Sequence, residues 1–389
     1  MSTSSTPLQR LSQLRSHLTS TSKNNTASLA PEIPYKITVI GSGNWGTTIA
    51  KVVAENTALR PHLFQRQVDM WVFEEKINGV NLTEIINSQH ENVKYLPGIK
   101  LPENLHAEPN IAKAAEGADL LVFNIPHQFL PRIVSNLQKA NLKPHVRAIS
   151  CLKGLEVTKQ GPKLLSTYIT ENLGAHCGAL SGANLAPEVA KEKWSETTVA
   201  YNLPNNFQGH GKDIDQAVLK AAFHRPYFHV RVISDVAGVS LAGALKNVVA
   251  LGVGFVEGLG WGDNAASAIQ RIGLNETVKF AETFFPGETN SDTFTKESAG
   301  VADLITTCSG GRNVRVAKEM ALTGKSAQEV EKELLNGQSA QGIITSKEVH
   351  ELLEHQNLTK EFPLFEAIYQ IVYGTESIER LPELIEEVE

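Results

Sequence analysis

Cysteine is scarce in this chain of 389 residues, which contains only Cys151, Cys177 and Cys308. The three lie far apart in the sequence. They form no Cys-x-x-Cys pair and have no cysteine–histidine spacing of the kind that binds zinc. The sequence therefore excludes a disulfide framework, predicts no metal site, and favours a reducing compartment.

Long hydrophobic runs and an excess of positive charge are also missing. The longest apolar stretch, residues 248–255, is much shorter than the roughly 20 residues that a membrane-spanning helix needs, so we expect no membrane span. The formal net charge of −6 argues against broad attraction to nucleic acid or to an acidic membrane surface. An anionic ligand must therefore be held by a few local cations.

The remaining composition is that of an ordinary globular protein, with 41% hydrophobic and 20% charged residues. A chain of this length exceeds what one hydrophobic core usually spans, so we expect two domains.

The first thirty residues differ from the rest of the chain. They are rich in serine and threonine, carry three basic residues, and contain no acidic residue before Glu32, as in an organelle transit peptide. In addition, Arg10-Leu11 followed after five residues by His17-Leu18 resembles the type 2 peroxisomal targeting signal, which an import receptor reads. The alternative is a disordered tail with a chance match. We expect a cytoplasmic protein that is also directed to peroxisomes.

A glycine-rich turn follows the first predicted strand. Residues 36–40 are a short β-branched run, residues 41–46 read GSGNWG, and residues 47–54 are helix-like. In such a turn Gly41 permits the tight bend, Gly43 lets the backbone approach a pyrophosphate, and Gly46 lets helix and strand pack closely. The helix N-terminus attracts the anion. This order predicts a dinucleotide site, with a purely structural glycine turn as the alternative.

Further predicted strands extend this half into a parallel sheet. Residues 68–73, 119–126 and 146–150 are apolar runs separated by helix-like sequence, which indicates a doubly wound α/β fold. Glu74 follows the run at residues 68–73. An acid there binds the adenosine ribose and disfavours a 2′-phosphate, which favours NAD over NADP, although residues 60–67 look like an insertion that lengthens the usual spacing.

Ligands of such sheets bind beyond the carboxyl ends of the strands. Phe129 and Lys153 both follow strands and are candidates for that region. Phe129 is either an aromatic wall for the cofactor or a packing residue. Lys153 precedes Gly154 and points an ammonium into the cleft, unless it is an ordinary surface lysine.

Beyond residue 234 the pattern becomes helical, with long stretches at residues 235–258, 295–308, 314–322 and 326–335. Lys246 falls on a helix face formed by Ala242, Gly243, Val249 and Ala250. Burial of this lysine lowers its pKa toward the range useful for proton transfer. The alternative is a lysine that extends to the surface at a helix edge.

A second polar group follows at residues 300–313. Asp303 and Thr307 share one helical face, and Gly310-Gly311-Arg312-Asn313 opens the next helix. Exposed glycine amides, a helix N-terminus and a two-pronged arginine suit a phosphate, while a glycine-capped turn with a surface arginine is the structural alternative.

Six motifs together closely resemble NAD-dependent glycerol-3-phosphate dehydrogenase, chiefly its eukaryotic cytosolic branch in the fungal form. The likeness runs from about Lys36 to the C-terminus, leaving out the tail and residues 205–216. The motifs are GSGNWG at 41–46, LKG at 152–154, SGANLAPEVA at 181–190, GALKNVVA at 243–250, SAGVADLITTCSGGRN at 298–313 and NGQSAQG at 336–342.

The resemblance implies a role for each matching residue. It makes Lys246 the general acid/base, assisted by Lys153 and Asp303. The substrate-binding residues that it implies are Lys153, Asn247, Thr307, Arg312 and Asn313. The cofactor-binding residues that it implies are Gly41, Ser42, Gly43, Asn44, Trp45, Gly46, Phe73, Phe129, Lys153, Ala186, Arg312 and Gln341. One departure is Ser339, where many relatives have a lysine.

The sequence thus predicts an α/β Rossmann domain with a doubly wound, mostly parallel sheet, followed by an all-α substrate domain. We expect a disordered, targeting-like tail at residues 1–33, the NAD-binding domain at residues 34–234, and the helical catalytic domain at residues 235–389. The expected reaction is reversible hydride transfer between NADH and glycerone phosphate, giving sn-glycerol 3-phosphate, by a homodimer. The alternatives are a β-hydroxy acid dehydrogenase of similar architecture and a non-catalytic NAD-binding sensor.

Overall fold

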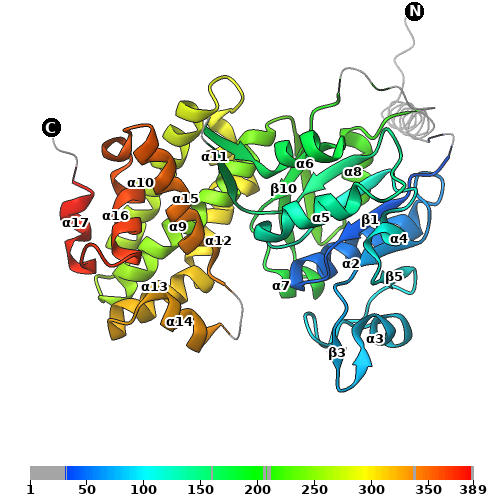
Figure 1. The fold of residues 1–389 in the computed structure, drawn as a ribbon, viewed down its shortest axis with the longest axis horizontal. Helices are drawn as coiled ribbons and strands as arrows, with labels where there is room; N and C mark the ends of the chain where they lie inside the picture. Colours follow the sequence, from blue (N-terminus) through cyan, green and yellow to red (C-terminus); the bar gives the residue numbers. More distant parts are fainter. Residues whose placement is uncertain are drawn as a thin grey trace, which may run out of the picture.

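A sheet-based N-terminal part and a helical C-terminal part lie side by side (Figure 1). The computed structural model describes residues 31, 33–158, 161–204, 207, 212–335 and 339–386. The targeting-like motif at Arg10-Leu11 and His17-Leu18 lies outside these residues.

Within the described residues, one sheet of eight strands forms the centre of the N-terminal part. All neighbouring strands run parallel except β10 and β11, which pair antiparallel. The sheet is therefore mostly parallel, as predicted. In spatial order the strands are β12 (Phe228–Ile233), β11 (Ser195–Ala200), β10 (His176–Ser181), β7 (Arg147–Ser150), β6 (Leu120–Phe123), β1 (Ile37–Ile40), β2 (Val68–Trp71) and β5 (Leu105–Glu108).

The central strands are apolar because helices cover both faces of the sheet. Every residue of β1, β6 and β7 is buried. Side chains alternate along a strand, so Ile37 and Val39 join one hydrophobic cluster, whereas Ile40 joins the cluster on the opposite face. This two-sided burial is the reason that the strands read as continuous apolar runs rather than alternating ones.

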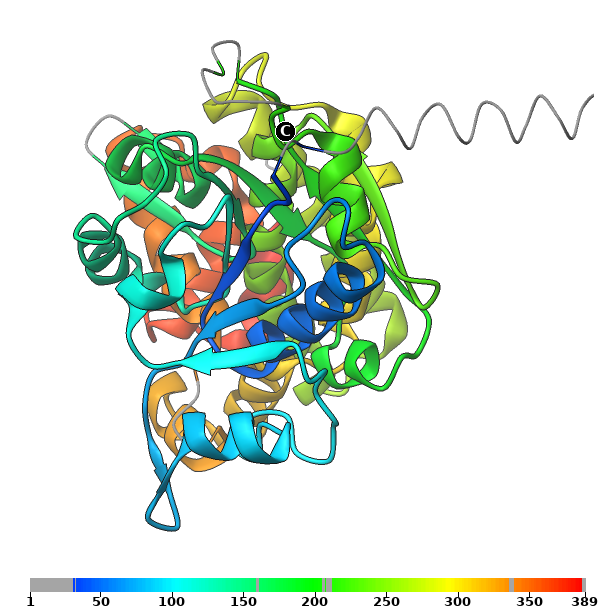
Figure 2. The same ribbon diagram turned by 90° about the vertical axis from the view of Figure 1, so that its right-hand side faces the viewer.

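Short helices and two hairpins connect the strands. Hairpin β3–β4 and helix α3 project away from the sheet, as Figures 1 and 2 both show. The helices are α2 (Asn44–Leu59), α3 (Leu82–Gln89), α4 (Ile111–Ala115), η1 (His127–Phe129), α5 (Leu130–Leu137), α6 (Leu165–Leu173), α7 (Ala186–Ala190) and α8 (Gln216–Phe223). The hairpins are β3 (Lys76–Ile77) with β4 (Val80–Asn81), and β8 (Leu155–Thr158) with β9 (Gly161–Leu164).

The C-terminal part is helical in the described residues. It consists of α9 (Val236–Gly258), α10 (Asp263–Phe284), α11 (Ser291–Lys296), the π-helical turn η2 (Ser298–Ala302), α12 (Asp303–Cys308), α13 (Arg312–Thr323), α14 (Ala327–Leu334), α15 (Gln341–His355), η3 (Thr359–Glu361), α16 (Pro363–Val372), η4 (Ile378–Arg380) and α17 (Leu381–Leu384).

Helix α9 is the centre of this part. A Cβ added at Gly254 would lie 2.4 Å from the Val314 carbonyl oxygen, and one at Gly258 would lie 2.5 Å from the Ala321 side chain. Both glycines therefore let α13 cross α9 closely. Among the described residues, α9 alone is long and apolar enough to cross a membrane, but 94% of its apolar window is buried in the protein. It is the core helix of this half.

The single helix predicted at residues 295–308 is wrong. Helix α11 ends at Lys296, Glu297 is extended, and a π-helical turn precedes α12. The side chain of Ser298 donates to the Glu196 carbonyl oxygen at 2.9 Å, which ties the segment to strand β11. A Cβ at Gly300 would lie 2.2 Å from the Phe294 carbonyl oxygen. These tertiary contacts, which helical periodicity does not reveal, break the helix just before Asp303.

The chain passes from the sheet-based part to the helical part between Ile233 and Val236, where the last strand ends and α9 begins. The predicted strands at residues 68–73, 119–126 and 146–150 correspond to the shorter β2, β6 and β7. Phe73 and Glu74 therefore lie beyond the end of β2, in a connecting segment.

Candidate functional site

The GSGNWG segment forms the turn between β1 and α2. Gly41 has φ +113°, and its added Cβ would lie 2.4 Å from the Asn124 carbonyl oxygen. A Cβ at Gly46 would lie 2.3 Å from the Gly41 carbonyl oxygen. Both glycines therefore have the turn and packing roles that the fingerprint predicts.

Gly43 faces open space. Among the described residues, no heavy atom beyond its chain neighbours lies within 4 Å of a Cβ added there, and no side chain caps the N-terminus of α2. The first backbone N–H groups of the helix therefore remain available for an anion. These features fit the pyrophosphate of a dinucleotide.

Two asparagines support this turn, and sequence reasoning missed both. The buried Asn92 donates to the Ser42 carbonyl oxygen at 3.0 Å and to Thr47 Oγ1 at 2.8 Å. Asn124 directly follows β6, and its Oδ1 is buried with no hydrogen-bond partner among the described residues. Only the position of Asn124 after a strand offered a sequence signal; Asn92 lies in an irregular segment with none.

Exposed aromatic side chains follow the strands on either side of β1. Phe73, after β2, is 64% exposed, and Phe129, after β6, is 50% exposed. Covering a large exposed aromatic side chain with a ligand stabilises the complex, because apolar surface is removed from water. Ala186 opens α7, and its carbonyl oxygen accepts from Thr48 Oγ1 at 3.3 Å, which places it beside α2. These three predicted residues thus border the same strand ends or the glycine turn.

Glu74 has a different partner from the predicted one. Its carboxylate accepts a hydrogen bond from the Thr83 backbone N–H at 3.2 Å and a second from the Thr83 hydroxyl. Glu74 thereby caps the first turn of α3. The structure does not support a carboxylate free to bind the adenosine ribose.

The two predicted lysines meet at one carboxylate. Lys246 on α9 donates to Asp303 Oδ1, and Lys153, after β7, lies 3.4 Å from Asp303 Oδ2. Asp303 opens α12 and is buried. Thr307 Oγ1 lies one turn further along α12, 3.5 Å from Asp303 Oδ1. The sheet half and the helical half each supply one cation to this group.

Lys246 is 5% exposed, so the alternative of a lysine extending to the surface is wrong. Burial lowers the pKa of Lys246 well below its usual value, the Asp303 carboxylate opposes this, and the Lys153 ammonium reinforces it. A lysine with a lowered pKa exchanges its proton more readily near neutral pH. Lys153 is 34% exposed on its side chain and faces the same carboxylate, so it is not an ordinary surface lysine.

Ser181 is a third partner of Asp303, and sequence reasoning missed this contact. Its hydroxyl donates to Asp303 Oδ2 at 3.2 Å. A Cβ at Gly243 would lie 2.8 Å from Ser181 Oγ, so only a glycine at that position of α9 leaves room for the serine. The position of Ser181 at the carboxyl end of β10 was the available signal.

The predicted phosphate turn lies at the N-terminus of α13, with Gly311 as its N-cap and Arg312 as its first residue. The neighbouring Asn313 donates to Asn247 Oδ1 at 2.9 Å and accepts from the Gly342 backbone N–H at 2.9 Å. A Cβ at Gly342 would lie 2.2 Å from the Asn247 carbonyl oxygen. Three helices, α9, α13 and α15, therefore converge at the predicted substrate residues.

Gln341 is the first residue of α15, directly before Gly342. Its side-chain amide donates to Ser339 Oγ at 2.7 Å, and its Oε1 is buried with no hydrogen-bond partner among the described residues. Ser339 thus accepts a hydrogen bond that orients Gln341.

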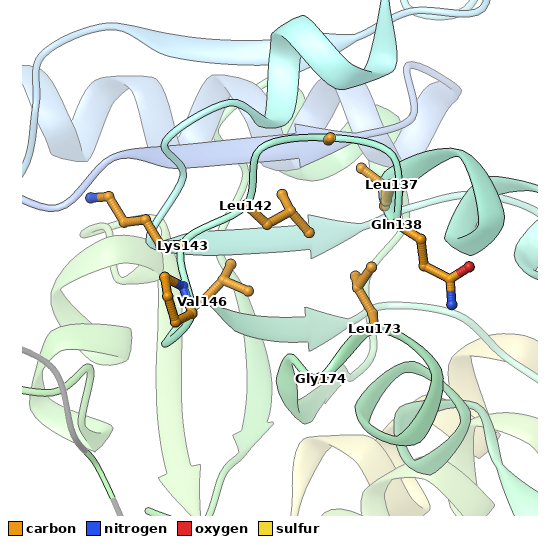
Figure 3. A pocket seen from close by; sticks show the side chains of 9 residues that line it. Leu137, Gln138, Leu142, Lys143, Val146, Leu173 and Gly174 are labelled. Atoms are coloured by element: carbon orange, nitrogen blue, oxygen red, sulfur yellow. The ribbon is translucent and has the colours of Figure 1, made fainter.

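A cavity elsewhere on the sheet domain does not belong to this site. It is lined by residues that include Leu142, Val146, Leu173 and Gly174 (Figure 3). Val146 directly precedes β7, so the cavity lies at the amino end of that strand, whereas the glycine turn lies at the carboxyl end of β1. Across the described ranges, no group of three or more histidine, cysteine or acidic side chains is placed to hold a metal ion.

The open glycine turn on one side and the lysine–aspartate–lysine group on the other define a dinucleotide-dependent oxidoreductase. Comparison with known sequences gives the particular family. The chain belongs to the NAD-dependent glycerol-3-phosphate dehydrogenase family, whose N-terminal part matches residues 36–207 and whose C-terminal part matches residues 235–383.

Individual relatives agree along nearly the whole chain. Glycerol-3-phosphate dehydrogenase [NAD(+)] 1 from Cyberlindnera jadinii is 85% identical over 389 residues, which is 100% of this chain and 98% of that protein. The relative named glycerol-3-phosphate dehydrogenase [NAD(+)] 2, mitochondrial, from Saccharomyces cerevisiae is 68% identical over 92% of this chain and 80% of its own length.

A solved structure of glycerol-3-phosphate dehydrogenase from Saccharomyces cerevisiae superposes with a TM-score of 0.85. It is 66% identical and covers 91% of this chain and 100% of its own. The family membership, the NAD cofactor and the oxidoreductase class predicted from the motifs are thereby confirmed, and the alternatives of a β-hydroxy acid dehydrogenase and a non-catalytic sensor are set aside.

Proposed function

We propose that this chain carries out the reaction of its family through Lys246, Asp303 and Lys153. The reaction is reversible conversion of glycerone phosphate to sn-glycerol 3-phosphate with NADH. The observation that carries the proposal is the buried contact of Lys246 with Asp303. Lys153, from the other half of the chain, contacts the same carboxylate. A buried lysine with a lowered pKa beside a carboxylate and a second cation is the kind of group that proton-transfer sites use.

NADH, when bound, supplies the hydride that the ketone carbon receives. The ketone oxygen, which then gains negative charge, takes a proton from the Lys246 ammonium. Lys153 polarises the same oxygen and stabilises its developing charge. Asp303 holds both lysines in place. It also raises the pKa of Lys246, so that the ammonium persists to a higher pH than burial alone would allow. In the reverse direction the neutral Lys246 amine accepts the alcohol proton.

The phosphate of the substrate is assigned to the N-terminus of α13. Arg312 offers two parallel donors, and the helix N-terminus favours an anion. Asn313 and Asn247, which hydrogen-bond each other, fix this turn against α9, where Lys246 lies one residue earlier. With Thr307, these residues place the carbonyl near the lysines while the phosphate remains anchored.

The cofactor is assigned to the glycine turn and its surroundings. Ser42, Asn44 and Trp45 lie within the turn and the first residues of α2, and Gly41, Gly43 and Gly46 shape it. Phe73 and Phe129 are exposed aromatic walls, and Ala186 lies beside α2. Lys153, after β7, and Arg312 and Gln341, the first residues of α13 and α15, are assigned to the cofactor as well.

An absorbance assay of the purified chain tests the proposed function. We expect NADH oxidation at 340 nm with glycerone phosphate to be much faster than with small keto acids, and faster than NADPH oxidation. Preference for a keto acid would overturn the assignment of substrate. Equal rates with NADPH would overturn the assigned cofactor preference.

We propose that the protein acts as a homodimer. Strand β12 is an edge strand of the sheet, and Trp194, 67% exposed, lies beside it in an edge-to-face contact with His229. An edge strand with an exposed aromatic neighbour is a surface that proteins tend to cover. Light scattering of the purified chain should give twice the 42.4 kDa of one chain. A single-chain mass at micromolar concentration would overturn this proposal.

We further propose a cytoplasmic protein that an import receptor also directs to peroxisomes. The support is the motif at Arg10-Leu11 and His17-Leu18 together with three free, buried cysteines. A fluorescent reporter fused to residues 1–33 should give a cytosolic signal with peroxisomal puncta, and Arg10→Ala should abolish the puncta. A uniform cytosolic signal under all growth conditions, or a mitochondrial signal, would overturn the peroxisomal assignment.

A further inference from the structure

A histidine–carboxylate contact joins the two halves of the molecule beside the proposed cofactor site. His127 opens the turn η1 after β6, and its Nε2 lies 3.4 Å from Glu348 Oε1 on α15. Both side chains are largely covered, at 9% and 21% exposed. The contact thus spans from the nucleotide half to the helix that begins with Gln341.

The His127 ring also packs against the segment that carries Lys153. Gly154 has φ +145°, and a Cβ added there would lie 3.0 Å from His127 Nδ1. Any larger residue at this position would push the ring away. The hairpin strand β8, which follows Gly154, packs in turn against α15. His127 is therefore held between the backbone next to Lys153 and the Glu348 carboxylate.

Stabilisation of the fold alone does not account for the contact between His127 and Glu348. Within the described ranges, His127 Nδ1 and Glu348 Oε2 are buried without hydrogen-bond partners. Leaving a buried polar atom unpaired costs free energy, and a buried ion pair often contributes no more than apolar packing would. Thr345 Oγ1 and Gln341 Oε1, on the same face of α15 at helical spacing, are likewise buried and unpartnered.

The neighbours of the two residues suggest what the contact does instead. Phe129 lies two residues after His127 in the same turn, and Gln341 lies two helical turns before Glu348 on the same face. We propose that the His127–Glu348 contact is a positioning pair that holds Phe129 and Gln341 at a fixed separation, so that both contact NAD together. The proposal rests on the cofactor roles assigned to Phe129 and Gln341 above.

The test is a double-mutant cycle on the full chain, read out by equilibrium titration with NADH. We expect His127→Ala and Glu348→Ala each to raise the Kd for NADH about three- to tenfold, in the range of coupling between residues in contact. The Kd of the double variant for NADH should be no higher than the higher of the two single-variant values, because both substitutions remove the same contact. At saturating NADH, kcat should stay within about twofold, since neither residue touches the proton-transfer group.

Glu366→Ala is the matched control. It breaks a second histidine–carboxylate pair of α15, with His350 Nδ1 2.7 Å from Glu366 Oε2, but both residues of that pair lie in the helical half. Glu366→Ala should lower Tm without changing the Kd for NADH. If it raises that Kd as much as Glu348→Ala does, the effect is general destabilisation of α15 and the proposal is overturned. Glu348→Gln, which keeps side-chain volume, and His127→Asn, which is smaller but leaves less of a cavity than alanine, serve if the alanine variants fold poorly.

Phe129→Ala separates this proposal from the assignment of the cofactor site. If Phe129→Ala weakens NADH binding but His127→Ala and Glu348→Ala do not, the positioning pair is overturned and the cofactor site stands. If Phe129→Ala has no effect on the Kd, the aromatic wall itself is wrong, and the positioning pair fails with it. If the effects of His127→Ala and Glu348→Ala on the Kd for NADH are additive, the two residues do not act through one contact, and the proposal is overturned.

Discussion

Replacing Lys246 with alanine should lower turnover about 10²- to 10⁴-fold while leaving NADH binding nearly unchanged. The magnitude is that of losing one general acid. The lysine lies on α9 against Asp303 and is not among the residues assigned to the dinucleotide, which should therefore keep its contacts. Steady-state assays with glycerone phosphate and an NADH titration of the same preparation measure the two quantities separately.

Two further variants make the Lys246 result interpretable. Lys246→Met keeps the length of the side chain and should lose turnover as severely as Lys246→Ala, without the cavity. Lys279→Ala breaks another lysine–carboxylate pair of the helical half, with Glu361 at 2.6 Å, and should retain normal turnover. Unchanged turnover in both Lys246 variants would refute the assigned role.

The pH dependence of the reaction should report the same residue. Because burial lowers the pKa of Lys246, its ammonium is lost at a lower pH than that of an exposed lysine. Ketone reduction needs the ammonium, so its kcat/KM should fall as pH rises through this lowered pKa. Alcohol oxidation needs the neutral amine and should rise over the same interval. Since Asp303 raises the Lys246 pKa, Asp303→Asn should move both limbs to lower pH.

Replacing Arg312 with alanine should weaken substrate binding and turnover together. Hydrogen bonds to a charged group contribute about 1.5–3 kcal/mol, so kcat/KM for glycerone phosphate should fall about 10- to 150-fold. Arg312 is an exposed residue at the N-terminus of α13, where a phosphate can reach both its side chain and the backbone amides, although partial burial of the guanidinium lowers its pKa. KM should rise and kcat should fall, because the phosphate anchor also positions the carbonyl.

Comparison with an unphosphorylated substrate identifies the group that Arg312 holds. At NADH concentrations that saturate both proteins, the slow reduction of glycerone itself should be the same for the native chain and for Arg312→Ala, since no substrate phosphate is present to anchor. Arg315→Ala, one turn further along α13 and also exposed, is the matched control and should leave both reactions unchanged. A native response of Arg312→Ala to the phosphorylated substrate would remove the anion site.

Local sequence was sufficient where chemistry depends on a short segment. The turn at Gly41–Gly46 is bounded by its own strand and helix, and the positive φ of Gly41 and the contact of Gly46 with the Gly41 carbonyl oxygen arise within a few residues. The apolar face around Lys246 was visible because helical neighbours lie three and four residues away. In both cases, the signal that the sequence carries comes from residues close to one another in the chain.

Local sequence was misleading where a distant segment competes. Glu74 stands after a strand, as a ribose-binding acid would, but Thr83 takes up its carboxylate. Helical periodicity at residues 295–308 suggested one helix, but bonds to β11 and the close approach at Gly300 divide it. Periodicity reports which face of a segment is apolar, not which other segment will form hydrogen bonds with it.

The sequence by itself determined the class of fold, the dinucleotide turn and the residue types of the site, because apolar periodicity and glycine placement act over a few residues. Only the tertiary structure decided which of these residues meet. Lys153 follows β7 and Ser181 ends β10, whereas Lys246 lies on α9, yet all three meet at the Asp303 carboxylate. His127 and Glu348 are 221 positions apart in the sequence and meet where α15 packs against β8, the strand that follows Gly154. Such contacts depend on how two separately formed halves dock, which no local pattern records.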